Sequence, residues 1–127
     1  MKIIGLGIDI VDNLRIKKLI KNKAFLTRVF TKKEISTSKK FRSKYSYYAK
    51  RFAAKEAFSK SIGTGFRKDL NFKDISIINN NLGKPSFLVN LRLKKLLKKK
   101  FNINSSNFLL SISDEKKYSI AFVIFQK

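Results

Sequence analysis

Hydrophobic and polar residues alternate near the start of the chain, which is the pattern of a β-strand. Over residues 3–11 one face of this strand carries Leu6, Ile8 and Ile10, and the other carries Gly5, Gly7 and Asp9. We expect the apolar face to lie in the core. The opposite face is almost bare of side chains and ends in a carboxylate, so Gly7 would leave room there for a bulky ligand.

A helical period replaces this alternation farther along the chain. It predicts four helices, over residues 13–22, 25–30, 43–62 and 91–101. Thr31 and Glu34 fit a capping box that opens a further helical turn. Gly63 ends the longest helix, because glycine readily adopts the left-handed conformation of a C-terminal cap.

Short apolar runs predict the remaining strands, over residues 74–78, 86–90, 108–113 and 119–125. Residues 79–84 would join the first two of these as a hairpin. The sequence has no internal repeat and no linker. We therefore expect one α+β domain over residues 1–127, in which a mostly antiparallel sheet packs against one long helix and several shorter ones.

The composition excludes several kinds of catalytic and metal site, but it does not identify the binding partner. The chain has 24 Lys and 6 Arg against 8 Asp and Glu, a net charge of +22, which attracts nucleic acid, phosphorylated ligands or an acidic protein. Abundant Lys, Asn, Ile and Phe are also what AT-rich codons encode, so codon bias is an equal explanation. Because the chain lacks Cys and His, disulfides, thiolate metal sites and Ser-His-Asp or Cys-His catalysis are excluded.

The hydropathy pattern gives no sign of export or of a membrane anchor. The apolar stretch at residues 120–125 is far too short to cross a bilayer. The first residues also lack the long apolar run and cleavage site of a signal peptide. We therefore expect a cytoplasmic protein.

In so basic a chain, each carboxylate is a candidate for a specific task. Glu56 shares one face of the long helix with Phe52 and Lys60, and an ordinary surface Glu–Lys pair would explain that spacing. Together with Asp9, Glu56 could instead hold one hard cation. Magnesium typically takes one or two carboxylates plus substrate phosphates, so a magnesium site is the functional alternative.

Two glycine-containing segments are further candidates, Gly63-Thr64-Gly65 and Gly83-Lys84-Pro85. The simplest interpretation of each segment is a turn, and contact with a ligand is the second interpretation. Neither completes a Walker loop, since no Gly-Lys-Ser/Thr follows.

Several segments, in order and at suitable spacing, resemble the signatures of the holo-acyl-carrier-protein synthases, the small bacterial 4′-phosphopantetheinyl transferases. The most specific is Arg51 to Lys60, with Gly7 to Val11 before it and Gly63 to Gly65 after it. The family's Thr-x-x-Glu, Gly-Lys-Pro and closing-hairpin segments are matched by Thr31 to Glu34, Gly83 to Pro85 and Ser111 to Ala121. The resemblance covers essentially the whole chain and implies the 4′-phosphopantetheinyl transferase fold.

The resemblance implies an enzyme that moves the 4′-phosphopantetheine arm of coenzyme A to a serine of apo acyl carrier protein. Adenosine 3′,5′-bisphosphate is released, and the step supports fatty acid biosynthesis. Asp9 and Glu56 match the family's magnesium ligands and catalytic groups, and Lys60 matches a lysine on the reacting phosphate. The implied coenzyme A site comprises Arg51, Ser59, Lys60, Gly63, Gly65, Lys84 and Pro85.

The resemblance also implies partners. Its carrier-protein docking surface corresponds to Arg15, Lys18, Lys21 and Arg28, whose charge would steer an acidic carrier into place. The family assembles as a homotrimer with active sites between subunits, which is the expectation for this chain.

Two points of the chemistry stay open at this stage. The serine needs a base, which could be a magnesium-bound water, the option that we favour, or one of the two carboxylates. Asp114 stands where many relatives have histidine and others have aspartate. No role of that histidine can be transferred, and an acid near phosphates could weaken coenzyme A binding locally.

A small nucleic-acid-binding protein is the alternative function. The charge and the many Phe and Tyr residues allow it, because aromatic rings can stack on bases. Against it, the aromatic residues mostly follow core periodicities, and the sequence contains no recognised nucleic-acid motif.

Overall fold

The computed structural model describes residues 1–63 and 69–127. The chain forms five helices and five strands within these ranges, together with two short 3₁₀ turns. The helices are α1 (Asn13–Leu19), α2 (Lys23–Val29), α3 (Lys32–Ser38), α4 (Lys44–Ile62) and α5 (Leu91–Phe101). The strands are β1 (Ile3–Asp12), β2 (Ile75–Asn79), β3 (Pro85–Val89), β4 (Phe108–Asp114) and β5 (Tyr118–Gln126).

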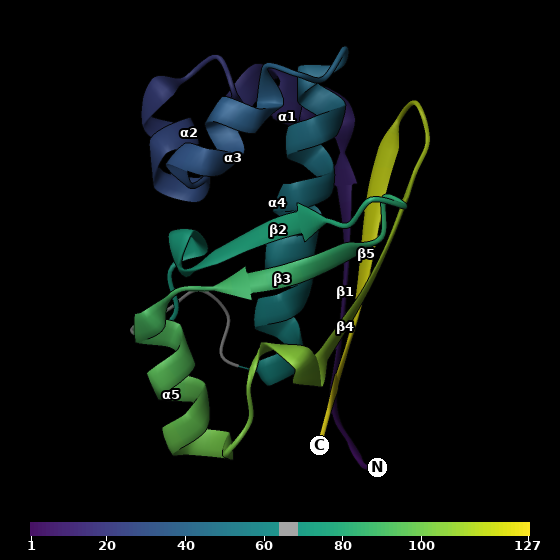
Figure 1. The fold of residues 1–127 in the computed structure, drawn as a ribbon. Helices are drawn as coiled ribbons and strands as arrows, with labels where there is room; N and C mark the ends of the chain where they lie inside the picture. The colour runs from purple at the N-terminus through teal and green to yellow at the C-terminus, as the bar shows by residue number, and fades with distance from the viewer. Residues whose placement is uncertain (64–68) are drawn as a thin grey trace.

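The strands form two antiparallel sheets, one on each side of the long helix α4 (Figure 1). One sheet has the order β1-β5-β4, and the other is the β2-β3 hairpin. The helices α1, α2 and α3 gather at the N-terminal end of α4, and α5 lies toward its other end. The predicted α+β class with antiparallel strands is confirmed.

Helix α4 forms the centre of the core, and consecutive residues along it are buried, so it is covered on most of its sides. Tyr48, Ala53 and Phe58 are among its buried residues. Its N-terminus is capped by the Ser43 hydroxyl, and its C-terminus ends at Gly63, whose φ of 79° is the left-handed conformation expected from the sequence. Rings from the sheet and the hairpin, Phe87, Phe108 and Phe125, complete the core.

The predicted boundaries agree closely with the observed ones, with one instructive difference. The first helix was expected to reach about residue 22 but ends at Leu19. The reason is that the Asn22 side chain accepts hydrogen bonds from the amides of Ala24 and Phe25, which starts α2. The capping box of Thr31 and Glu34 is confirmed, with both of its hydrogen bonds present.

The face prediction for β1 is wrong. Leu6, Ile8 and Ile10 are 57%, 60% and 61% exposed, whereas the glycine face packs against α4. A Cβ atom on Gly7 would lie 1.8 Å from the carbonyl oxygen of Ala57, and one on Gly5 would lie 1.9 Å from that of Ser61. The glycines thus let the helix approach the strand, and the space expected for a ligand at Gly7 is filled by α4.

Candidate active site

Asp9, Glu56 and Lys60 meet where β1 passes α4. The close packing of Gly7 on the helix brings the end of the strand beside the helical face that carries Glu56 and Lys60. The Lys60 ammonium donates to Asp9 Oδ1 at 3.0 Å and to the Ile8 carbonyl at 3.0 Å. Lys60 therefore makes its ion pair across to the strand and not with Glu56 on its own helix.

The pKa of Glu56 is shifted by its partial burial and by the charged groups around it. Partial burial of its carboxyl, and then the negative charge of Asp9, raise the pKa of Glu56. Lys60 and Arg15 oppose that rise. Because the charge of Asp9 acts on Glu56, the two carboxylates expected to act together lie close in space. Arg15 also acts on Glu56, so α1 lies near the same edge of α4.

The two carboxylates fit a magnesium site in which other ligands complete the coordination of the ion. Asp9 and Glu56 supply hard oxygen donors from a strand and a helix. In the part of the chain that the structure describes, no group of three or more His, Cys, Asp or Glu residues could hold a metal by itself. Two carboxylates and open positions are what magnesium uses when substrate phosphates and waters supply the remaining ligands.

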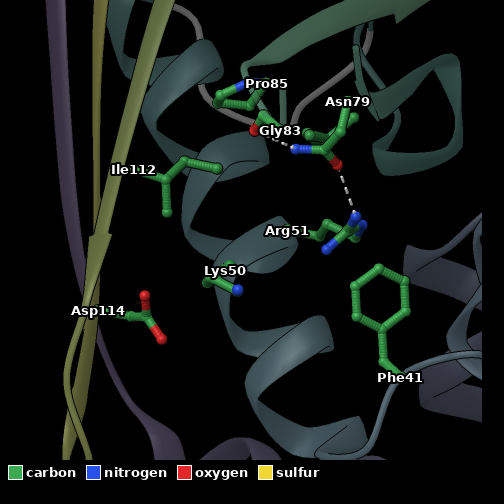
Figure 2. Close-up of a pocket in the computed structure, with 9 residues that line it drawn as sticks. Phe41, Lys50, Arg51, Asn79, Gly83, Pro85, Ile112 and Asp114 are labelled. Atoms are coloured by element: carbon green, nitrogen blue, oxygen red, sulfur yellow. Dashed lines mark hydrogen bonds between the residues drawn. The ribbon is translucent and has the colours of Figure 1, made fainter. Parts of the chain in front are cut away.

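A pocket of about 380 Å³ lies on the other flank of α4, between that helix, the β2-β3 hairpin and β4 (Figure 2). Its walls combine positive charge, apolar surface and one carboxylate. This composition suits a ligand that has both an anionic group and a flat apolar part. The lining residues are Phe41, Lys50, Arg51, Ile77, Asn79, Gly83, Pro85, Ile112 and Asp114.

Arg51 is held firmly in the wall of this pocket. Its guanidinium lies 3.5 Å from the centre of the Tyr47 ring and donates to the Tyr47 carbonyl and to Asn79 Oδ1, at 3.2 and 3.0 Å. Arg51 Nε is buried without a hydrogen-bond partner among the described residues. Asn79 in turn donates to the Gly83 carbonyl at 3.0 Å, which connects Arg51 to the hairpin turn.

The carboxylates and the pocket lie on different faces of α4. Glu56 follows Arg51 by five residues, which turns its side chain by about 140° around the helix axis. The sheet agrees, since Asp9, Ala121 and Ile112 stand side by side on β1, β5 and β4. Ala121, in the middle, is fully buried. The helix therefore separates Asp9 from the pocket within one chain.

The other residues expected at a coenzyme A site are scattered. Pro85 lines the pocket, whereas Lys84 is exposed on the hairpin turn and donates its backbone amide to Asn80. Ser59 is buried, and its hydroxyl donates to the Glu56 carbonyl. Gly63 caps α4, and Gly65 lies outside the described residues.

The expected docking residues are all exposed but do not form one patch. Arg15 and Lys18 belong to α1, and Lys21 follows it. Lys21 borders a basic hollow with Lys17, Ile20 and residues 42–45. Arg28 lies on α2 and borders a different hollow, whose other wall is formed by residues 70–74.

Of the pocket residues, sequence reasoning identified Arg51, Pro85 and the position of Asp114, but it missed Lys50 and Asn79. These two line the pocket from α4 and β2, and nothing in their local sequence brings them together. Sequence reasoning also missed the buried Lys55 ammonium, which pairs with Glu34 at 2.6 Å. Here a signal existed, because Lys55 occupies the apolar face of α4, three residues from both Phe52 and Phe58.

Two observations concern the wider function classes. Within the described residues, the structure has no helix that is long and apolar enough to span a bilayer. Most of the aromatic rings, including Tyr48, Phe58 and Phe125, are buried in the core. These buried rings cannot stack on bases. The abundance of Phe and Tyr is therefore explained by the core and does not indicate nucleic-acid binding.

Comparisons with known proteins converge on one family. The 4′-phosphopantetheinyl transferase superfamily profile matches residues 5–123. A holo-[acyl-carrier-protein] synthase of Pelagibacter ubique is 64% identical over 127 residues, which cover 100% of this chain and 99% of that protein.

Solved structures agree with the sequence matches. A holo-[acyl-carrier-protein] synthase from Neisseria meningitidis superposes with a TM-score of 0.90 and 41% identity, over 98% of this chain and 99% of the other. A Bacillus anthracis holo-(acyl-carrier-protein) synthase, in complex with CoA (3′,5′-ADP), gives a TM-score of 0.81 and 32% identity, over 100% and 99%.

Proposed function

Because the chain belongs to the 4′-phosphopantetheinyl transferase superfamily, and within it to the holo-[acyl-carrier-protein] synthases, we propose that it transfers 4′-phosphopantetheine from coenzyme A to a serine of apo acyl carrier protein. Adenosine 3′,5′-bisphosphate is the second product. The observation that carries the proposal is the meeting of Asp9, Glu56 and Lys60, two carboxylates and a cation from separate elements, at an accessible edge of α4.

In this proposal Asp9 and Glu56 would hold a magnesium ion, which would neutralise charge on the pyrophosphate of coenzyme A. Phosphoryl transfer needs positioning and charge neutralisation more than covalent help from the protein. Lys60 turns from Asp9 toward the reacting phosphate and stabilises the negative charge on the oxygen that leaves.

The proton of the attacking serine needs an acceptor, and the chain has no histidine. Burial of the carboxyl and the nearby Asp9 raise the pKa of Glu56, but a magnesium ion on the two carboxylates would oppose that shift. We therefore propose that a water beside the two carboxylates acts as the base.

The nucleotide end of coenzyme A occupies the pocket between α4, the hairpin and β4. Lys50 and Arg51 supply positive charge there, and Phe41, Pro85 and Ile112 supply apolar surface. Asp114 faces into the same pocket (Figure 2). It is the feature that least suits a phosphate, and it accepts from Ser46 at 3.4 Å. We propose that phosphates lie toward Arg51, on the side of the pocket away from Asp114 (Figure 2).

The acyl carrier protein docks on α1. Arg15 is near enough to Glu56 to affect its pKa, so a carrier held by Arg15 and Lys18 would present its serine beside the carboxylates. The acidic carrier and the basic helix attract each other over about a Debye length, roughly 8 Å at physiological salt. Lys21 extends this surface, whereas Arg28 would contact a different part of the carrier.

A homotrimer would bring the two halves of the site together. The exposed face of β1 continues onto β5 through the pair Ile8 and Phe122, and apolar patches of this kind mark protein contacts. Since α4 separates Asp9 from the pocket within one chain, the carboxylates of one copy would work with the pocket of the next. Each interface in a ring of this kind joins two different surfaces.

Within the cell, we propose that residues 1–127 act as one cytoplasmic domain whose product, holo acyl carrier protein, supports fatty acid biosynthesis. The chain uses coenzyme A and the carrier protein as its substrates. Magnesium is its only proposed cofactor.

Mass spectrometry of apo acyl carrier protein, incubated with the chain, coenzyme A and magnesium, tests this function. The carrier should gain the mass of one phosphopantetheine, and EDTA, Asp9→Ala or Glu56→Ala should abolish the gain. Asp69→Asn is the matched control, because the Asp69 carboxylate forms an exposed pair with Lys100. A folded wild-type chain that modifies none of several apo carriers would contradict the proposal.

A further inference from the structure

A buried ion pair outside the pocket joins the elements that build it. Lys55 Nζ donates to Glu34 Oε1 at 2.6 Å, and the two side chains are 0% and 3% exposed. The same ammonium donates to the carbonyls of Val29 and Phe72, at 2.8 and 3.2 Å. All three of its protons are therefore used, each on a different segment of the chain.

Glu34 completes the connection to the hairpin. Its second oxygen, Oε2, accepts from the Ile77 backbone amide in β2 at 3.1 Å, and Oε1 also accepts from the Thr31 amide at 3.0 Å. Helix α4 is thus joined to β2 through one carboxylate, at a depth that water does not reach.

A second connection lies one helical turn away. Arg51 precedes Lys55 by four residues, a rise of about 6 Å along the helix, and it donates to Asn79 Oδ1. Asn79 follows Ile77 by two residues, about 6.6 Å along a strand. Because the two spacings match, β2 is fixed to α4 at two points, and the hairpin cannot pivot about either one.

We propose that Glu34 and Lys55 are positioning residues for coenzyme A, which hold the hairpin wall of the pocket at a fixed distance from α4. Three of the pocket residues, Arg51, Ile77 and Asn79, are members of the two connections. Lys55 does not line the pocket, and Glu34 borders the adjoining hollow on the other side of Arg51, Ile77 and Asn79. We therefore expect the pair to act on the pocket through those residues. This inference rests on the proposed transferase function.

The pair is better explained by geometry than by stability. Buried ion pairs contribute little net stability, because desolvation of both charges offsets their attraction. Burial lowers the pKa of Lys55, and the charge of Glu34 opposes that shift. Two apolar residues would fill the same space at no such cost, but they could not orient a backbone amide of β2.

The test replaces both charges at once, since removal of one partner leaves a buried charge uncompensated. In Glu34→Gln/Lys55→Met, the glutamine keeps one acceptor and the methionine fills the lysine stem. Loosening the wall should raise the KM for coenzyme A about tenfold, and weaken calorimetric binding of adenosine 3′,5′-bisphosphate equally. The kcat and the KM for the carrier protein should stay within about twofold.

A matched control comes from the other end of the hairpin. Asp74 and Arg92 also pair at 2.6 Å, with a largely buried carboxylate, but neither lines the pocket. Asp74→Asn/Arg92→Met likewise removes an ion pair whose members hydrogen-bond the backbone, and it should leave the KM for coenzyme A unchanged. If Glu34→Gln/Lys55→Met fails to fold, Glu34→Asp, which keeps the charge but shortens the side chain that reaches the Ile77 amide, should give a smaller rise in the same KM.

The outcomes separate the two proposals. Wild-type transfer together with an unchanged KM and nucleotide affinity in the double variant would overturn the positioning role alone. Equal rises in both double variants would also overturn it, because they would indicate general loosening. A wild-type chain that neither transfers phosphopantetheine nor binds the nucleotide would overturn both proposals.

Discussion

The two flanks of α4 are built in different ways. The carboxylate flank, which carries Asp9, Glu56 and Lys60, depends on one close contact, in which Gly7 lets β1 approach the helix. The pocket flank depends on hydrogen bonds that pass from α4 to β2 and on to the Gly83 turn. The first flank holds charged groups near solvent, whereas the second fixes a wall. Chemistry and binding are thus supported by separate structures, and each should fail separately.

The largest effect is expected at the carboxylate flank. Glu56→Gln keeps the size of the side chain but removes its charge, so transfer should lose roughly a thousandfold in kcat. Binding of adenosine 3′,5′-bisphosphate without magnesium should be unchanged, because neither Glu56 nor Asp9 lines the nucleotide pocket. Single-turnover kinetics beside calorimetry measures both, and a parallel loss of nucleotide affinity would show that the flanks are not separate.

The carboxylate flank was predicted more completely from the sequence than the pocket flank. Asp9 and Glu56 were identified from their rarity and from family segments, and the capping box and helix ends follow from local rules. On the pocket flank the family segments identified Arg51, Pro85 and the position of Asp114, but not Lys50 and Asn79, which come from α4 and β2. Tertiary contacts alone bring Lys50 and Asn79 together, so no local pattern could identify them.

The inverted face of β1 has a physical explanation as well. Alternation of apolar and small residues indicates two different faces, but it does not say which face is covered by the protein itself. Leu6 and Ile8 were assigned to the core because burial of apolar side chains is the usual outcome. Here the glycine face allows a helix to approach, and the apolar face is left for another surface.

The next effect tests whether the flanks of different copies work together. Glu56→Gln chains and Lys50→Glu chains should each be nearly inactive, since each lacks one flank. Co-refolded in equal amounts, they should recover roughly a quarter of the wild-type rate, because each site draws its two flanks from neighbouring copies. If mass spectrometry shows that the oligomers contain both chains and activity still does not recover, the result would contradict a site shared between copies.

The matched control for this mixing removes the contact between copies. Ile8→Lys places a charge on the exposed apolar face without disturbing the glycine face of β1. When both chains carry it, recovery should disappear and sedimentation should report a smaller particle. Recovery that persists in dissociated chains would show that the two flanks serve one chain.

A smaller effect is expected at the contact that creates the carboxylate flank. In Gly7→Ala the new methyl group would meet the Ala57 carbonyl at 1.8 Å, so β1 must move away from α4. We expect a loss of about 3 kcal/mol in the free energy of unfolding, measured by urea denaturation. Gly63→Ala is the comparison, because apart from its chain neighbours none of the described residues lies within 4 Å of the added methyl group there, but φ is +79°. Its cost should be about 1 kcal/mol, and the reverse order would contradict the role of Gly7.

The smallest effect concerns how the carrier reaches the carboxylate flank. Arg15→Glu reverses a charge on α1 that acts on Glu56, so the KM for the carrier should rise about tenfold while the KM for coenzyme A does not change. The difference from wild type should shrink as salt is added, because screening weakens long-range attraction. Lys95→Glu on α5 is the matched control, since it changes the net charge equally at the far end of α4. If both reversals raise the carrier KM alike, the carrier responds to the total charge of the protein, and α1 is not a specific docking surface.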